Sequence, residues 1–152
     1  MHTRLMGTKR VDEAINMTWK RRILVYGSRG IELSDLELEA VLLQWPFPLN
    51  KICLISGGAK GPDRAAIFYA EKHGCDVIEI PAKWDEFGSA AGMKRNKEMG
   101  DIAQYACGWW DGESRGTAGM TSILTKKNTP LILTMKTAAV AKVVTHEPPK
   151  GL

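Results

Sequence analysis

Short apolar runs alternate with longer amphipathic stretches along most of the chain. Each run has four or five residues, largely apolar at consecutive positions; the runs are 23–26, 52–55, 77–80, 105–109 and 131–134. Strands that are buried on both faces produce this continuous pattern, so the runs predict the strands of a parallel sheet. The stretch 140–145 offers one further edge strand.

The stretches between these runs carry helix start and stop signals. Ser34 and Glu37 have the spacing of a capping box, Pro62 suits the first turn of a second helix, and Gly74 suits its end. Two more helices are expected at about 89–102 and 117–127. This alternation predicts an α/β fold: a Rossmann-like, mostly parallel sheet of five or six strands with helices on both faces.

The composition is consistent with this fold, whereas the net charge is unevenly distributed along the chain. With 152 residues, 44% of them hydrophobic and 25% charged, the composition is that of one ordinary globular domain. The net charge of +4 comes entirely from the first 22 residues, which hold six bases against two acids. We therefore expect a basic N-terminal arm at 1–21, a single domain at 22–146 and a disordered tail at 147–152.

The cellular compartment follows from what the chain lacks and from its cysteines. No apolar run reaches the ~18 residues of a membrane helix, and the N-terminus lacks the apolar core of a signal peptide. Cys53, Cys75 and Cys107 each lie in an apolar segment, which favours buried thiols over disulfides or a zinc site. We expect a cytoplasmic protein with no metal site and no cofactor.

Four loops rich in small residues follow predicted strands, at 27–30, 56–61, 88–92 and 112–117. At the carboxyl edge of an open α/β sheet, glycine lets backbone N–H groups approach an anion, and the following helix N-terminus adds partial positive charge. Ordinary turn geometry is the competing explanation for any one loop. Bases that suit a phosphorylated ligand lie in or beside these loops: Arg29, Lys60, Arg64, Lys94, Arg95 and Arg115.

Two standard nucleotide fingerprints are absent. There is no G-x-x-x-x-G-K-[ST], which argues against P-loop ATP hydrolysis, and no G-x-G-x-x-G after the first strand, which argues against an ordinary dinucleotide dehydrogenase.

None of the three histidines is placed as a triad base or metal ligand. Acid–base chemistry would fall to loop carboxylates that capping explains equally well: Asp63, Asp85, Glu86, Asp111 and Glu113. Trp84 and Trp110 could stack on a base or simply pack.

Five ordered motifs resemble the SLOG superfamily, in particular its small stand-alone YspA/YpsA-related branch of bacteria and their phages. They are Gly27-Ser28-Arg29, the segment SGGAKGPD at 56–63, PAKW at 81–84, GMKRN at 92–96 with Met99, and Gly116-Thr117. The resemblance covers about residues 23–134. It implies a Rossmann-like fold in a superfamily of nucleotide or nucleotide-derivative sensors, "lonely guy" phosphoribohydrolases, and DNA-processing protein A, which binds single-stranded DNA.

The chain departs from the phosphoribohydrolase pattern P-G-G-x-G-T-x-x-E. Met120 stands where that pattern has its glutamate, and Glu113-Ser114 replace the double glycine. Methionine cannot accept a proton, so the resemblance does not bring this activity with it. Arg95 is similar to the arginine of the enzymes' M-x-x-R-K helix, with Asn96 in place of the lysine. The neutral body also differs from the basic surface of the DNA-processing protein.

The residues and the resemblance together favour a sensor or processing domain whose partner is a nucleotide or nucleotide-derived phosphorylated small molecule. The expected ligand-binding residues are Gly27, Ser28, Arg29, Ser56, Gly57, Gly58, Ala59, Gly61, Asp63, Trp84, Arg95, Asn96, Gly116 and Thr117, and the catalytic candidates are Asp63, Arg95 and Glu113. Two alternatives stay open: a nucleotide N-glycosidic hydrolase, and a single-stranded DNA-binding module that uses the N-terminal arm. The resemblance also implies a homodimer or higher oligomer, for which residues 45–48 offer an apolar patch.

Two positions carry sharper expectations. Gly58→Val should block ligand binding through Cβ crowding while the protein stays folded. Arg95 shares a helix face with Met99, four residues on, so it should face the sheet. There it should meet either the bound phosphate or a structural carboxylate such as Asp63 or Asp111.

Overall fold

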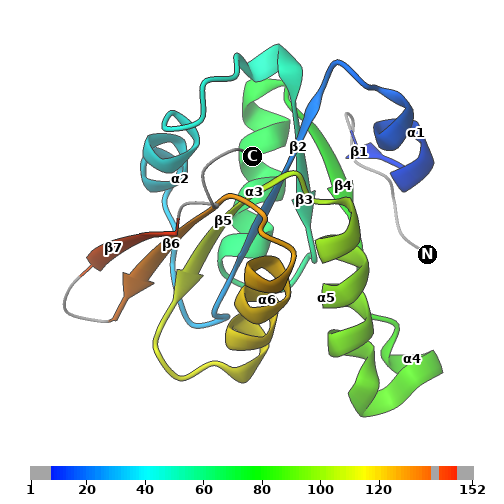
Figure 1. The fold of residues 1–152 in the computed structure, drawn as a ribbon, viewed down its shortest axis with the longest axis vertical. Coiled ribbons are helices and arrows are strands. Elements are labelled where there is room, and N and C mark those ends of the chain that lie inside the picture. The colour runs from blue at the N-terminus through cyan, green and yellow to red at the C-terminus, as the bar shows by residue number, and fades with distance from the viewer. Residues whose placement is uncertain (1–7, 138–140, 147–152) are drawn as a thin grey trace.

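Seven strands form one sheet in the order β1-β4-β3-β2-β5-β6-β7 (Figure 1). The computed structural model describes residues 8–137 and 141–146. The strands are β1 Thr8–Lys9, β2 Arg21–Gly27, β3 Ile52–Ser56, β4 Asp76–Glu79, β5 Tyr105–Trp110, β6 Leu131–Lys136 and β7 Ala141–His146. Every neighbouring pair is parallel except β6 and β7. The Rossmann-like α/β prediction is confirmed. The sheet has more than five or six strands because a two-residue strand at its edge pairs with β4.

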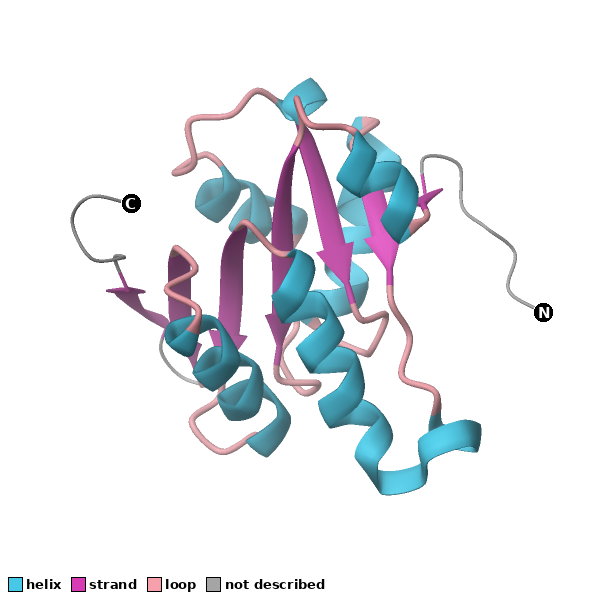
Figure 2. Ribbon diagram, turned by 45° about the vertical axis from the view of Figure 1, so that its right-hand side comes forward, coloured by secondary structure: helices cyan, strands magenta, loops and turns pink. Residues whose placement is uncertain are grey.

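Helices cover both faces of this sheet (Figure 2). Helices α2 (Asp35–Leu42) and α3 (Pro62–His73) pack on one face, and α5 (Ala91–Ile102) and α6 (Arg115–Lys126) pack on the other. Ile23 and Val25 of β2 point into the first core, whereas Leu24 and Tyr26 point into the second. The unbroken apolar run in the sequence thus reflects a strand that fills two cores.

Local signals mark the start of α2 and both ends of α3. Ser34 accepts from the Glu37 backbone N–H, and the Glu37 side chain accepts from the Ser34 backbone, which completes the predicted capping box of α2. Helix α3 begins at Pro62 and ends before Gly74, as expected. The predicted third helix is preceded by the short helix α4 (Trp84–Phe87) and a 3₁₀ turn at Gly88–Ala90, which the sequence pattern did not predict. In Figure 1, α4 projects beyond the end of α5.

Residues 8–21 do not form a free arm, in contrast to the prediction for 1–21. Strand β1 pairs with β4, and the short helix α1 (Val11–Asn16) buries Ala14 in the second core. Lys20 forms an ion pair with Asp76 at the start of β4. The physical reason is that the sheet edge at β4 offers unpaired backbone groups and an apolar surface that this segment covers. The predicted tail at 147–152 lies outside the described residues.

The order of the strands creates a switch point between β2 and β5. From β2 the chain runs outward through β3 to β4, then crosses back and runs through β5 to β6 on the other side. Gly27, at the end of β2, lies opposite Trp109 of β5. In open α/β sheets the loops diverge at this position and leave a crevice beyond the strand ends. Among the described residues, no helix has the length and apolar character needed to cross a membrane.

Candidate functional site

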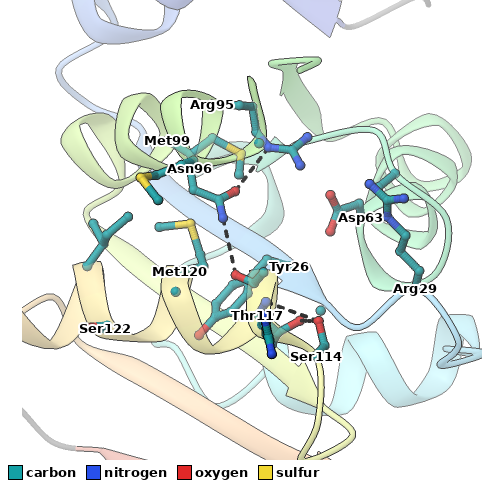
Figure 3. A pocket seen from close by; sticks show the side chains of 18 of the residues that line it. Tyr26, Arg29, Asp63, Arg95, Asn96, Met99, Ser114, Thr117, Met120 and Ser122 are labelled. Atoms are coloured by element: carbon teal, nitrogen blue, oxygen red, sulfur yellow. Dashed lines mark hydrogen bonds between the residues drawn. The ribbon is translucent and has the colours of Figure 1, made fainter. Parts of the chain in front are cut away.

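A pocket of about 830 Å³ opens at this switch point, between α5 and α6 (Figure 3). Its lining comes from the carboxyl end of β2, the loops after β2, β3 and β5, and the facing sides of the two helices. This volume lies within the usual range for small-molecule sites. The predicted location at the carboxyl edge of the sheet is thus where the structure has a cavity.

The Asp63 carboxylate is buried at the bottom of the crevice. Asp63 stands in the first turn of α3, and its carboxylate accepts the backbone N–H groups of Ala59 and Gly27. Burial raises the pKa of Asp63 to about 6, although nearby Arg95, these two N–H donors and Arg29 each act to lower it. Asp63 is therefore easier to protonate than an ordinary aspartate. Two of the loop N–H groups expected near an anion, those of Gly27 and Ala59, thus face the protein's own carboxylate.

Arg95 enters the pocket from α5. Its Nη1 donates to the Gly57 carbonyl oxygen at 2.8 Å, and its Nε donates to Asn96 Oδ1 at 3.1 Å. Asn96 in turn donates to the Gly116 carbonyl oxygen of α6 at 3.3 Å. Burial lowers the pKa of Arg95, and the Asp63 charge opposes that shift. Arg95 thus faces inward, as its spacing from Met99 predicted, and its helix is tied to two of the ligand-side loops.

Gly57 is required by the close approach of this arginine and Asp63. A Cβ at Gly57 would lie 2.5 Å from Arg95 Nη1 and 2.7 Å from Asp63 Oδ2. Both distances are shorter than van der Waals contact allows, so any side chain would displace the two charged groups. Within the described part of the chain, Arg95 and Asp63 are charge neighbours rather than a direct ion pair. Each therefore keeps hydrogen-bonding capacity toward the pocket.

A network of hydroxyl groups fixes the N-terminus of α6 beside the loop after β2. Ser114 caps the helix by accepting from the Thr117 backbone N–H, and the Thr117 hydroxyl lies 3.2 Å from Ser28 Oγ. Ser28 also accepts the Asp111 backbone N–H. The Asp111 carboxylate accepts the N–H groups of Ser114 and Glu113, which hold its pKa below the ordinary value. This network places the N–H groups of the first turn of α6 at the pocket rim.

The opposite wall of the pocket is apolar. Met99, Met120 and Ile123 lie where α5 and α6 pack together, and Met93 and Trp84 extend this wall toward the opening. Met120, at the position of the phosphoribohydrolase glutamate, is buried and packs near Gly100 of α5. This side of the pocket therefore offers sulfur and hydrocarbon contacts in place of a carboxylate.

The structure brings most of the predicted ligand residues together. The pocket is lined by Gly27, Arg29, Ala59, Asp63, Trp84, Arg95, Asn96, Gly116 and Thr117. Four others support its walls from behind: Ser28, Ser56, Gly57 and Gly61. Ser56 Oγ donates to the Asp63 carbonyl oxygen and accepts the Gly58 N–H, so it fixes the turn before α3. Glu113 is exposed and does not line the pocket.

Gly58 lies against the end of β4 and is not among the residues that line the pocket. Its φ is +74°, and a Cβ there would meet the Glu79 side chain at 3.2 Å, at the end of β4 and away from the pocket. A substitution at Gly58 therefore strains the backbone and presses on Glu79, and the expected loss of ligand binding in Gly58→Val stays a prediction.

Several lining residues were not among the predicted binding residues. They are Tyr26, Gly30, Ser89, Gly92, Met93, Met99, Asp111, Ser114, Arg115, Gly119, Met120, Ser122 and Ile123. The apolar members follow helical periodicity on α5 and α6, the pattern of an ordinary core face. Only the separation of the two helices at the strand ends turns that face into a pocket wall. Ser114 could have been found from its N-cap position, three residues before Thr117.

Comparisons with known proteins agree with this architecture. Residues 21–87 match the model of the YspA, cpYpsA-related SLOG family, which confirms the resemblance to the SLOG superfamily. The fold is similar to that in the X-ray structure of DNA processing protein A (DprA) from Streptococcus pneumoniae, with a TM-score of 0.60 and 15% sequence identity. That similarity covers 81% of this chain and 53% of the other, so the chain spans about half the length of that protein. No curated protein matches the chain.

Proposed function

We propose that this SLOG-type chain binds a nucleotide or nucleotide-derived phosphorylated ligand in the switch-point pocket. The observation that carries the proposal is the convergence of three arginines from separate elements on one cavity. Arg29 comes from the loop after β2, Arg95 from α5 and Arg115 from the first turn of α6. Guanidinium groups are the side chains best suited to phosphate oxygens.

The pocket also has the division that a nucleotide requires. Arg115 and the helix dipole attract an anion to the α6 N-terminus, and Arg29 and Arg95 add positive charge near Asp63. The methionine-lined wall and the half-exposed ring of Trp84 offer a surface for a flat, weakly polar nucleobase. A phosphate without a base would contact the cationic side of this cavity and leave its apolar wall without a ligand contact.

A ligand panel tests the proposal directly. Nucleoside mono-, di- and triphosphates should raise the melting temperature and give saturable heats in calorimetry, whereas the matching nucleosides should bind more weakly. The phosphate dependence should weaken in Arg29→Ala and persist in Lys97→Ala, which removes an exposed cation of α5 that does not line the pocket. Equal binding of nucleosides and nucleotides, or no binding by either, would contradict the proposal.

A nucleotide hydrolase is the second candidate, and Asp63 is the observation that favours it. A buried pocket carboxyl with a pKa of about 6 can donate or accept a proton at neutral pH. Incubation of each nucleotide with stoichiometric protein, followed by chromatography, would detect released base or phosphate. Release that disappears in Asp63→Asn supports hydrolysis, and unchanged nucleotide leaves binding as the activity.

A further inference from the structure

The Asp63 carboxylate defines which part of the ligand can lie at the bottom of the pocket. Asp63 is 5% exposed, yet it lines the cavity, and Figure 3 shows its carboxylate directed into the space that the Arg95 side chain enters. The N–H groups of Gly27 and Ala59 hold the carboxylate from behind. These two N–H groups favour the orientation of the carboxylate toward the cavity.

A phosphate does not fit at this position. The two backbone N–H donors that would bind it are already occupied by Asp63, and the carboxylate would repel a second anion. Arg115, by contrast, is an exposed cation in the first turn of α6, whereas Arg29 lies on the Asp63 side of the pocket (Figure 3). The anionic end of a ligand therefore lies toward α6, and a neutral part of the same ligand lies over Asp63.

A hydroxyl group of the ligand would best satisfy the remaining hydrogen-bonding capacity of Asp63. An ionised carboxylate has about four acceptor sites, and two backbone N–H groups leave capacity for a further donor. Beside it, the Arg95 guanidinium has donors in excess of its bonds to Gly57 and Asn96. A hydroxyl both donates and accepts, so it can bond to the carboxylate and to the guanidinium together.

We infer that a ribose hydroxyl of the bound nucleotide donates a hydrogen bond to the Asp63 carboxylate. The pocket therefore selects ribonucleotides over deoxyribonucleotides. The inference rests on the proposed function, since it requires that a nucleotide binds here. Its physical basis is the asymmetry of buried hydrogen bonds. A deoxy ligand covers Asp63 without providing a donor. The carboxylate then loses its hydrogen bonds to water and gains none from the ligand.

The test compares matched ligands on the unaltered protein. AMP, GMP, CMP and UMP are titrated by calorimetry at pH 7.5 beside their 2′-deoxy and 3′-deoxy counterparts. At least one deoxy series should bind about tenfold or more weakly, as expected for losing a hydrogen bond to a charged acceptor. Equal affinity for ribo- and both deoxy series overturns the inference and leaves the proposed function intact. The same comparison is made with the di- and triphosphates, and if no nucleotide of any series binds, both fail.

A variant locates the selectivity at Asp63. Asp63→Asn should lose most of the preference for the ribonucleotide, whereas Asp101→Asn, the same change at an exposed carboxylate of α5 outside the pocket, should keep it. Selectivity that persists in a folded Asp63→Asn protein would overturn the assignment. Should Asp63→Asn not fold, because its amide would face the Gly27 or Ala59 N–H, the ligand comparison on the unaltered protein still decides.

Discussion

The guanidinium of Arg95 donates a 2.8 Å hydrogen bond to the carbonyl oxygen of Gly57, which joins the middle of α5 to the loop between β3 and α3. Residues 38 positions apart in the chain thereby form one corner of the pocket. The same arginine lies beside the Asp63 carboxylate, whose ionised form it stabilises. Arg95 therefore supports the geometry of the empty pocket and also offers charge to a ligand.

Changing Arg95 should affect ligand binding more than folding. Arg95→Ala should weaken nucleotide affinity about tenfold or more, and Arg95→Lys should weaken it less, because lysine keeps the charge but loses the planar fork. The free energy of unfolding should fall by about 1 kcal/mol for each of the two hydrogen bonds that Arg95 donates, which is too little to unfold the protein. Calorimetry and urea unfolding measure the two effects.

Lys97→Ala is the matched control for this experiment, because it removes an exposed cation from the same helix. If Arg95→Ala instead unfolds the empty protein while the folded fraction binds nucleotide normally, Arg95 belongs to the structural frame alone.

A methyl group at Gly57 should disturb the pocket from behind. Gly57→Ala places a Cβ 2.5 Å from Arg95 Nη1 and 2.7 Å from Asp63 Oδ2, so one of the charged groups must move. We expect a loss of stability of about 1–3 kcal/mol together with weaker ligand binding. Gly119→Ala is the contrasting change, since it has open space on α6 and should stabilise the helix by up to about 1 kcal/mol. A neutral Gly57→Ala would mean that Arg95 and Asp63 have room to relax.

Backbone conformation, rather than ligand contact, should govern substitutions at Gly58. Its φ of +74° lies in the left-handed region, which costs a β-branched residue most and asparagine least. Gly58→Val should therefore lower the melting temperature well below that of Gly58→Asn. Differential scanning calorimetry of the two variants measures the difference. Gly58→Val with an unchanged melting temperature and no ligand binding would instead support the expectation that crowding in the loop blocks ligand binding in a folded protein.

The raised pKa of Asp63 predicts a definite pH dependence of stability. Because the folded-state pKa of about 6 exceeds the ordinary value of 3.8, the folded protein binds this proton more tightly than the unfolded chain does. The stabilisation is complete below pH 3.8 and is lost as the pH rises through 6. From pH 7.5 to pH 4, the protein should gain up to roughly 3 kcal/mol relative to Asp63→Asn.

Parallel urea titrations of the two proteins at several pH values would measure this difference, since contributions from other acidic groups cancel in the comparison. A constant difference across the range would show that the Asp63 carboxyl titrates as an ordinary aspartate.

Much of the fold was readable because its signals are local. The apolar runs marked β2 to β6, and residues such as Ser34, Glu37 and Pro62 marked helix starts through hydrogen bonds and dihedral angles that act within a few positions. The short helix α4 and strand β1 were missed, because four-residue and two-residue elements lack a measurable period. The packing of residues 8–21 was missed because its cause is a distant sheet edge.

The candidate site was likewise predictable where it depends on local sequence and unpredictable where it depends on contacts between distant residues. From the sequence alone, strand patterns and glycine-rich loops determined an α/β sheet and the edge at which a ligand would bind, because those features depend on neighbours in the chain. The tertiary structure decided that the Asp63 carboxylate meets the N–H groups of Gly27 and Ala59, that Gly58 faces Glu79, and that core-patterned methionines line a cavity. These outcomes depend on which distant groups meet at the switch point, and burial and charge there act between residues far apart in the chain.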